Sequence, residues 1–485
     1  MKLAQALAGY AGWLGHGHED RAAAWVTRLE VNGPEIEAFR AASTPRCAAY
    51  LPVATRIEPA RGAGSNETTP PADAKGALAR AEKRGDLNAF TFLPQRLDAP
   101  VRGLLCGVAV AVKDLMLVKG MPLTAGSKAM DADVATMDAE IVARLRRAGA
   151  IIVGLTNLHE FAYGITSDNP RFGRVLNPAA PSRIPGGSSG GSAAAIAAGI
   201  VPLAVGTDTA GSIRVPAACC GIVGFKPSYD ALPRDGVLDL AHSLDHVGPM
   251  GRTVEDCAAM FAAMLDLREI PKWTRPDLAG VTLARLGGYF AAPLDDEVRA
   301  ALDAAFAALA KDGARRIDRE VEGAALGPAI QFNTICPEST AFHAERLAKR
   351  PSDYGEDVRV RLEIGMFLPG PWYVKAQRMR RELADRMDAV LAEADAIVLP
   401  TMRAPAPPVG AGRAMIGGKE FALHTAVTNL TGPFNLTGLP AISVPWTKSR
   451  DGVPICLQVV GGRGRDWDVL AIARRLEAAT ANARA

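Results

Sequence analysis

The sequence predicts an α/β fold with a buried β-sheet. Apolar runs of strand length alternate with stretches whose apolar residues recur at helical spacing. The composition is that of a globular chain, with 48% hydrophobic and 22% charged residues. The 485 residues can bury a sizeable core, and they allow either about three domains or one large α/β unit with additions.

The amino-terminal part of the chain is predicted to be helical. Residues 1–53 are rich in alanine, and residues 58–72 then collect Pro, Gly, Ser, Asn and Thr, which is typical of a linker. A short helix is expected over residues 73–86. We therefore expect a helical segment and linker over residues 1–70, before the main domain.

A strand, a helix and a second strand are predicted next. Residues 104–112 form an apolar run of strand length that ends at Lys113. Residues 138–147 place their apolar side chains at helical spacing, and Gly149 closes this helix. Residues 150–155 are typical of a buried strand, so the three elements form one α/β unit.

Further helices and strands are predicted toward the carboxyl end. Helices are expected over residues 296–311 and 373–394, and the second leads into an apolar strand at residues 396–399. A final helix is expected from residue 467. No internal repeat is visible, so the α/β class rests on this alternation alone.

Charge and cysteine usage exclude several classes of function. Lys and Arg exceed Asp and Glu by only three, so the chain lacks the excess of cations that a dedicated nucleic-acid binder needs. The seven cysteines are an odd number without a CxxC pair, which argues against a disulfide framework or a zinc site. We expect a reduced, cytoplasmic protein.

No targeting or membrane segment is predicted. The apolar run after Lys2 is interrupted by polar residues and glycines, and no clear cleavage site follows it. The longest apolar run, residues 193–205, contains Gly199 and Pro202 and is shorter than the roughly 20 residues that a membrane helix needs.

Residues 186–228 differ from the rest of the chain. They include nine glycines and only three charged residues, where the average composition gives about four and about nine. Such sequence suits a backbone that approaches something closely while buried. Two patterns stand out, GGSSGGS starting at Gly186 and GTDTAGSIR starting at Gly206.

Three local interpretations of the first pattern compete. A glycine-rich turn that caps a buried helix, with Ser189 or Ser192 as the N-cap, is the simplest. A phosphate loop needs Lys followed by Ser or Thr at the helix start, and no such pair follows Gly191. The pattern also matches the GxSxG nucleophile elbow, but the prolines in residues 177–185 prevent the strand that this motif requires.

The two patterns together resemble the amidase signature family. Ser188 lies in Gly-Ser-Ser-Gly, Ser212 follows in Ala-Gly-Ser 24 residues later, and Lys113 ends an apolar strand 75 residues upstream of Ser188. Other segments that are similar to this family cover residues 149–157, 216–227, 243–250 and 438–445. The similarity is nearly continuous over residues 80–260 and strong again over residues 396–475.

The resemblance implies the architecture in more detail. The fold expected is a large mixed β-sheet core covered by helices, with an N-terminal helical segment. Residues 71–485 would form the amidase signature domain, divided into a core at 100–260, a variable substrate-facing part at 270–395 and a carboxy-terminal part of the core at 396–485.

The resemblance also implies a Ser–Ser–Lys triad. The family pattern carries over onto Ser212 as the nucleophile, Ser188 as the relay hydroxyl and Lys113 as the base. Lys113 must be neutral to accept a proton, and burial in the charge-poor segment is expected to lower its pKa. In this family the peptide bond before the relay serine is cis, which is therefore expected for Gly187–Ser188.

Residues around the triad are expected to support it. The oxyanion hole is expected to consist of the backbone N–H groups of Thr209, Ala210, Gly211 and Ser212. Side chains expected to brace the loop or to hydrogen-bond behind the triad are those of Ser189, Thr207, Asp208 and Arg214. Many relatives have glycine in place of Ala210, and alanine tolerates fewer backbone angles, so a slightly different hole geometry is expected.

The substrate pocket is less well defined by the sequence. Ala162 and Tyr163 lie in a segment that is similar to the one that lines the family's acyl pocket. Trp446 and residues 330–342 are further candidates that nothing in the sequence places. None of the histidines that could suggest a serine–histidine mechanism stands in a triad motif; these are His159, His242, His246, His343 and His424.

The expected function is hydrolysis of a small-molecule carboxamide, or of a related carbamate or urea-type C–N bond, through an acyl-enzyme on Ser212. Ammonia or an amine would be released, without a metal ion or organic cofactor. Two alternatives stay open: a glutamine-hydrolysing subunit of a tRNA-dependent amidotransferase, and a non-catalytic binding or scaffold protein on the same fold. Relatives are often homodimers, and no nucleic-acid or membrane partner is expected.

Overall fold

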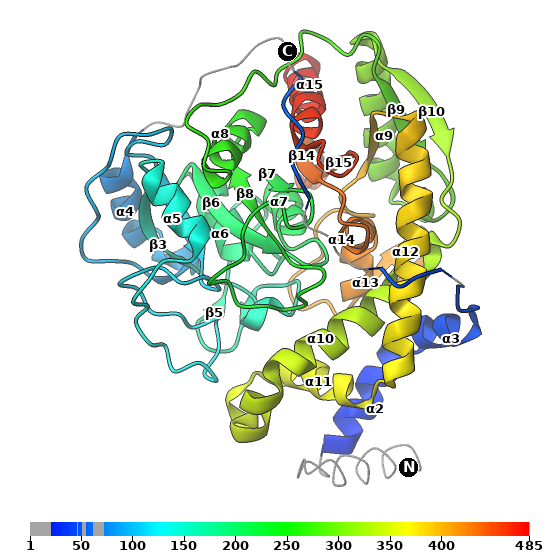
Figure 1. Cartoon of the computed structure of the whole chain (residues 1–485), viewed down its shortest axis with the longest axis horizontal. Helices are drawn as coiled ribbons and strands as arrows, with labels where there is room; N and C mark the ends of the chain where they lie inside the picture. The colour runs from blue at the N-terminus through cyan, green and yellow to red at the C-terminus, as the bar shows by residue number, and fades with distance from the viewer. Residues whose placement is uncertain (1–20, 46, 51–54, 62–71, 485) are drawn as a thin grey trace.

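The computed structural model describes residues 21–45, 47–50, 55–61 and 72–484. The helix expected over residues 1–20 and the linker residues 62–71 lie outside the described residues. An eleven-stranded mixed β-sheet forms the centre of the molecule, with helices on both of its faces (Figure 1). The predicted fold class is thereby confirmed.

The sheet has the strand order β1-β3-β2-β6-β8-β7-β14-β15-β11-β9-β10. Its strands are β1 (Phe90–Phe92), β2 (Ala109–Lys113), β3 (Ile151–Thr156), β6 (Leu203–Asp208), β7 (Val223–Lys226), β8 (His246–Gly251), β9 (Thr282–Leu286), β10 (Arg315–Arg319), β11 (Ala396–Pro400), β14 (Ala441–Lys448) and β15 (Pro454–Val460). Two small two-stranded sheets pair β4 (Asp168–Asn169) with β5 (Gly173–Arg174) and β12 (Arg413–Ile416) with β13 (Lys419–Ala422).

The described α-helices are α2 (Ala22–Val31), α3 (Gly33–Ala41), α4 (Ala74–Lys83), α5 (Glu140–Arg147), α6 (Gly190–Ala197), α7 (Arg214–Cys220), α8 (Val254–Met264), α9 (Asp296–Lys311), α10 (Gly327–Lys349), α11 (Glu356–Ile364), α12 (Gly370–Glu393), α13 (Leu423–Thr428), α14 (Gly432–Leu436) and α15 (Asp466–Arg484). The helices expected over 73–86, 138–147, 296–311, 373–394 and from 467 correspond to α4, α5, α9, α12 and α15. The expected strands at 150–155 and 396–399 correspond to β3 and β11.

Strand β2 divides the core and positions Lys113. Val110 and Val112 belong to the core that includes α5 and α8, whereas Ala109 and Ala111 pack in a second core with α4 and α6. Side chains alternate between the faces of a strand. Lys113 therefore leaves the end of β2 on the same side as Ala109 and Ala111, toward α6.

Two predicted boundaries are wrong. The strand expected over residues 104–112 begins only at Ala109, because the chain turns before it and Gly107 has a φ of +76°. The helix expected over residues 1–53 ends at Ala41. Pro45 explains this end in part, since a proline disfavours helical backbone at the residue before it.

The N-terminal helices pack far from the next helix in the chain. In Figure 1, α2 and α3 lie beside α10 and α11, whereas α4 lies at the opposite side of the molecule. The Trp25 indole N–H donates to Glu363 Oε2 at 2.7 Å, and its ring lies 4.9 Å from that of Phe367. Trp25 and Phe39 are fully buried, so these helices are anchored through their apolar faces.

No helix in the described ranges is long and apolar enough to cross a membrane. Likewise, within these ranges, no three His, Cys, Asp or Glu side chains come together in a way that could hold a metal ion. All seven cysteines are free thiols.

Candidate active site

Lys113 is fully buried, and its side-chain nitrogen is surrounded by three hydroxyl groups. Lys113 Nζ lies 2.7 Å from Ser188 Oγ, 3.0 Å from Ser189 Oγ and 2.7 Å from Thr207 Oγ1. Burial lowers the pKa of Lys113 from its ordinary value near 10.5 to about 7, although the nearby carboxylates Asp208 and Asp245 act in the opposite direction. A substantial fraction of this lysine can therefore exist as a neutral amine near pH 7.

The glycine-rich turn before α6 brings Ser188 and Ser189 to Lys113. The Gly187–Ser188 peptide bond is cis, as the resemblance implies. A Cβ on Gly187 would lie 2.7 Å from the Ile165 carbonyl carbon, and one on Gly191 would lie 2.3 Å from Asn157 O. The glycines are therefore required because other backbone passes directly against this turn.

The capping interpretation of this turn is wrong for the side chains. Ser189 occupies the N-cap position of α6 but makes no side-chain capping hydrogen bond. Its hydroxyl instead faces Lys113 Nζ and donates to Thr207 O at 3.3 Å. Ser192 contacts Thr156 Oγ1 at 2.7 Å, inside the helix.

Ser212 lies in the loop between β6 and α7, beside the Lys113 cluster. Its side chain is nearly buried, with 7% exposed. Within the described residues, its hydroxyl makes no hydrogen bond, while its carbonyl accepts the Ser189 N–H at 3.3 Å. The structure thus joins Lys113 to Ser188 by side chains and Ser189 to Ser212 by backbone, and leaves the Ser212 hydroxyl uncommitted.

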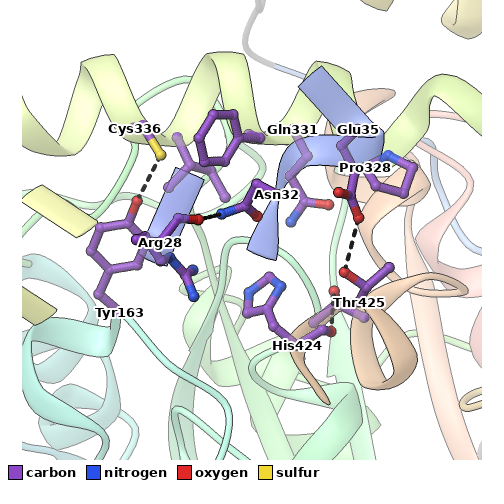
Figure 2. A pocket seen from close by; sticks show the side chains of 12 residues that line it. Arg28, Asn32, Glu35, Tyr163, Pro328, Gln331, Cys336, His424 and Thr425 are labelled. Carbon is purple, nitrogen blue, oxygen red and sulfur yellow. Dashed lines mark hydrogen bonds between the residues drawn. The ribbon is translucent and has the colours of Figure 1, made fainter. Parts of the chain in front are cut away.

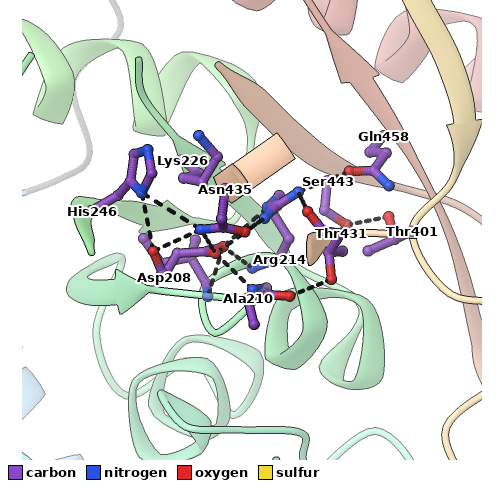
Figure 3. A network of polar contacts seen from close by, with 12 residues as sticks. Asp208, Ala210, Arg214, Lys226, His246, Thr401, Thr431, Asn435, Ser443 and Gln458 are labelled. Atoms are coloured by element: carbon purple, nitrogen blue, oxygen red, sulfur yellow. Dashed lines mark hydrogen bonds and ion pairs between the residues drawn. The ribbon is translucent and has the colours of Figure 1, made fainter. Parts of the chain in front are cut away.

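A buried ion pair holds the loop that contains Ser212 (Figure 3). Asp208 and Arg214 are both fully buried, and Arg214 Nε and Nη2 each lie 3.0 Å from an Asp208 oxygen. The Arg214 guanidinium holds the pKa of Asp208 well below its usual range, against the effect of burial. Asn435 Nδ2 also donates to Asp208 Oδ1, at 2.8 Å, and Arg214 Nη1 donates to Gln458 Oε1 at 3.1 Å. A charged pair that is satisfied on all sides can fix a loop precisely in position.

The backbone N–H groups of this loop are not equivalent. The Gly211 N–H donates to Asp208 Oδ1 at 2.7 Å and is therefore already committed. In the described part of the chain, the N–H groups of Thr209, Ala210 and Ser212 have no acceptor. Ala210 is not among the residues with positive φ, whereas Gly211 has a φ of +135°, so alanine fits its position without backbone strain.

Several residues that support this loop have no local signal in the sequence. Thr431 Oγ1 donates to Ala210 O at 2.7 Å, and Asp245 Oδ1 accepts from Thr209 Oγ1 at 2.5 Å. Burial raises the pKa of Asp245 to about 7. Asp245 stands in a segment that is similar to the family, but its residue type alone suggests no role. Thr431 and Asn435 reach the loop only because β14 pairs with β7 in the sheet.

A narrow cavity of about 50 Å³ lies near this loop (Figure 2). Helices α2, α3, α10 and α13 supply most of its wall. The lining residues are Arg28, Asn32, Glu35, Tyr163, Pro328, Gln331, Phe332, Ile335, Cys336, His424, Thr425 and Thr428.

The predicted pocket residues occupy different places. Tyr163 lines the cavity, and its hydroxyl lies 3.2 Å from Cys336 Sγ. Ala162 is buried next to it, with a positive φ of 58°. Residues 330–342 belong to α10 and contribute to the cavity wall, whereas Trp446 packs in the main core.

The histidines lie apart from the two serine hydroxyls. In the described structure, no histidine side chain hydrogen-bonds to Ser188 or Ser212. His159 Nε2 instead contacts Asp357 at 3.0 Å, and His246 Nδ1 contacts Leu244 O at 2.6 Å. Burial lowers the pKa of His246 well below its usual value. A serine–histidine arrangement is therefore not formed.

Comparison with known proteins identifies the family. A family model described as Amidase matches residues 84–470. The chain is 37% identical over 395 residues to AtzE of Pseudomonas sp. (strain ADP), which is part of a 1-carboxybiuret hydrolase; the match covers 79% of this chain and 86% of that protein. It is 34% identical over 447 residues to the A-type subunit of glutamyl-tRNA(Gln) amidotransferase from Koribacter versatilis (strain Ellin345), covering 82% and 92%.

A solved structure gives the same result. The crystal structure of an amidase superposes with a TM-score of 0.77 and 35% sequence identity, covering 84% of this chain and 95% of that one. The matched region includes the glycine-rich turn, the loop that contains Ser212 and most of the sheet. With its fold, its motifs and this similarity taken together, the chain belongs to the amidase signature family.

Proposed function

We propose that this chain is an amidohydrolase that cleaves a carboxamide, or a related carbamate or urea-type C–N bond, through an acyl-enzyme on Ser212. The observation that carries the proposal is the fully buried Lys113, 2.7 Å from Ser188 Oγ and with a pKa of about 7. A neutral lysine can act as a general base toward a serine hydroxyl.

The contacts of Lys113 Nζ fit a neutral amine. A neutral amine has two N–H bonds and one lone pair. Ser189 directs its own hydrogen toward Thr207 O, so its oxygen is free to accept from Lys113. If Thr207 accepts the second N–H, the lone pair remains for the Ser188 hydroxyl.

This assignment gives the order of the proton transfers. Ser188 passes its proton to Lys113 and takes the proton of Ser212 as Ser212 Oγ attacks the carbonyl carbon. The C–N bond then breaks, and Ser188 returns a proton to the leaving nitrogen while Lys113 restores it to Ser188. Water repeats the same steps on the acyl-enzyme and releases the acid.

The developing oxyanion needs donors near Ser212 Oγ. The free N–H groups of Thr209, Ala210 and Ser212 are the candidates, and the N–H of Gly211 is the weakest because Asp208 already accepts it. Asp208, Arg214 and Thr431 then act as positioning residues that fix the direction of these N–H groups.

The second candidate is a glutamine-hydrolysing component of an amidotransferase, which the 34% identity to such a protein favours. The two differ in whether a partner is needed. Release of ammonia from simple amides by the purified chain alone would support the first, and hydrolysis of glutamine only in a complex would support the second.

The test is a screen of aliphatic amides, anilides, carbamates and biuret-like compounds with purified protein and two variants. Ser212→Ala should lower kcat at least about 10³-fold, because the nucleophile is lost. Ser182→Ala is the matched control, since this exposed serine precedes the same glycine-rich turn, and it should keep full activity. Intact mass after rapid acid quenching should show an acyl adduct on the parent protein and none on Ser212→Ala. An unchanged rate in Ser212→Ala would refute the mechanism.

A further inference from the structure

The cavity of Figure 2 is walled in part by the N-terminal helices. Arg28 lies on α2, Asn32 between the two helices, and Glu35 on α3. These residues face α10 and α13, which are some 300 and 400 positions later in the chain. The N-terminal helices thus contribute polar groups to the cavity wall, in addition to their apolar contacts.

Arg28 is a cation without an ion pair. Figure 2 shows its side chain pointing into the space between Tyr163 and His424. Among the described residues, its guanidinium has neither a hydrogen bond nor a carboxylate partner. Burial and the nearby Arg361 lower the pKa of Arg28. Arg361 differs, because it is paired with Asp357 at 2.6 Å. A largely buried guanidinium without an anion is unfavourable, and a bound anion would compensate it.

Two more polar atoms in the cavity wall lack partners among the described residues. Gln331 is 7% exposed, and its Nε2 is a buried donor without an acceptor. Glu35 Oε1 accepts from Thr425 Oγ1 at 3.3 Å, but its Oε2 is buried without a donor. The cavity therefore offers a cation and a free N–H for an anion, together with one carboxylate oxygen for an N–H group.

The cavity adjoins the loop that contains Ser212. Thr428 lines the cavity, and its carbonyl accepts from Thr431 Oγ1 at 3.2 Å. The same hydroxyl donates to Ala210 O. Gln331 also reaches toward this loop, since a Cβ on Gly432 would lie 2.2 Å from Gln331 Oε1. One layer of side chains thus separates the unpaired groups from the proposed nucleophile.

We infer that this cavity binds the far end of the substrate, and that the substrate is an amide that carries a carboxylate. Arg28 binds the carboxylate, Gln331 donates to it, and Glu35 accepts an N–H from the remainder of the molecule. Arginine suits this role because its planar fork matches a carboxylate. The inference rests on the proposed hydrolysis at Ser212 and adds the class of substrate.

The experiment compares acidic and neutral amides of equal length, namely succinamate with succinamide and glutaramate with glutaramide. The parent protein should prefer the acidic member of at least one pair. Arg28→Gln should lower kcat/KM for that member about 10- to 100-fold, mainly through KM, and leave the neutral amide within about twofold. Arg28→Lys keeps the charge and should recover part of the loss.

Arg40→Gln is the matched control. Arg40 lies on α3, is mostly exposed and pairs with Glu37, so its loss should change neither substrate. Thermal melting of all variants shows whether the fold is retained. Equal losses for acidic and neutral amides in Arg28→Gln, or no loss for either, would overturn the inference.

A binding measurement separates this inference from the proposed function. Calorimetry with succinate and glutarate on Ser212→Ala needs no hydrolysis. Binding that Arg28→Gln weakens at least tenfold would support the anion site even if no amide is cleaved. No binding of either dicarboxylate, or binding that Arg28→Gln leaves unchanged, would overturn it.

Discussion

At the scale of single residues, the proposed chemistry depends on keeping Lys113 neutral. A buried lysine without a carboxylate in direct contact loses hydration that nothing else replaces fully. Its three neighbours are hydroxyl groups, which can accept its hydrogens without adding charge. The same burial therefore supplies a base near neutral pH and lowers the free energy of unfolding.

The first prediction concerns the pH dependence of hydrolysis. Lys113 is protonated below its pKa of about 7 and cannot then accept a proton. For a neutral amide, kcat/KM should fall about tenfold per pH unit below pH 7 and level off above it. A profile that stays flat down to pH 5 would contradict a lysine base.

Two other buried groups require controls in that measurement. Burial raises the pKa values of Asp245 and Glu160 to about 7 as well. Asp245→Asn and Glu160→Gln each remove one of these titrations. The acid limb should persist in both variants if Lys113 is responsible for it.

The second prediction concerns stability. Between pH 7 and 10.5, Lys113 is protonated in the unfolded chain and mostly neutral in the native one. The unfolded state then binds more protons, so this group makes the free energy of unfolding rise with pH over that window, by up to about 1.4 kcal/mol per pH unit. Lys113→Met removes this contribution.

The measurement is denaturant unfolding at several pH values. Lys113→Met should be inactive, and its stability relative to the parent should be greatest at or below pH 7 and decline as the pH rises to 9. A stability difference that stays constant over this range would show that Lys113 has an ordinary pKa.

Motifs can predict residues of the candidate site only where the chemistry is written locally. Lys113, Ser188 and Ser212 lie in recognisable segments, and so their proximity could be expected from the family resemblance. Arg28 and Gln331 lie in segments without such a motif. They meet because two helices from distant parts of the chain pack together, which no local pattern encodes.

At the scale of elements, the turn before α6 is the most constrained part of the site. Gly191 starts this helix against the backbone of Asn157 and Ala89, and a Cβ would lie 2.3 and 2.5 Å from their carbonyl oxygens. Backbone cannot yield as a flexible side chain does. The turn and strand β3 are therefore fixed to each other.

Gly191→Ala should accordingly lower the free energy of unfolding by more than about 2 kcal/mol and reduce activity, since Ser188 and Ser189 would shift away from Lys113. Gly370→Ala is the matched control, because nothing lies within 4 Å of the Cβ it would add at the start of α12. Urea unfolding and kcat/KM of both variants test this. Equal stability of the two variants would show that the turn tolerates displacement.

Long periodic elements were predictable, whereas their boundaries depended on single residues. The expected helix at 296–311 agrees with α9 at both ends. The strand expected from residue 104 fails because apolar character alone does not distinguish a turn from a strand. The strand order was not predictable from residue patterns, since β14 and β15 join β7 from more than 200 residues away.

At the scale of the whole molecule, the N-terminal helices complete the helical layer that carries the cavity. Trp25 contacts Glu363, a fully buried carboxylate that Arg21 and Arg359 also bind. We propose that residues 71–485 form the catalytic domain and that α2 and α3 add to its substrate-facing part.

The final prediction tests this attachment. Trp25→Ala removes the fully buried indole and should cost about 3–5 kcal/mol of the packing that holds α2 to α11. Limited proteolysis should then cleave near the N-terminal helices while the sheet domain stays intact. Val31→Ala, which truncates an exposed side chain of the same helix, should leave the proteolysis pattern unchanged. Loss of the entire fold in Trp25→Ala would show that these helices are part of one cooperative unit.

The separation between the sheet and this helical layer has a consequence for how new specificities arise. Lys113, Ser188 and Ser212 are held by β2, β6 and the glycine-rich turn, whereas the cavity wall belongs mainly to α2, α3, α10 and α13. Substitutions in those helices can change which molecules are accepted while the reacting groups keep their positions. Selection for a new substrate, in nature or in the laboratory, therefore has a surface on which it can act without first disabling the enzyme.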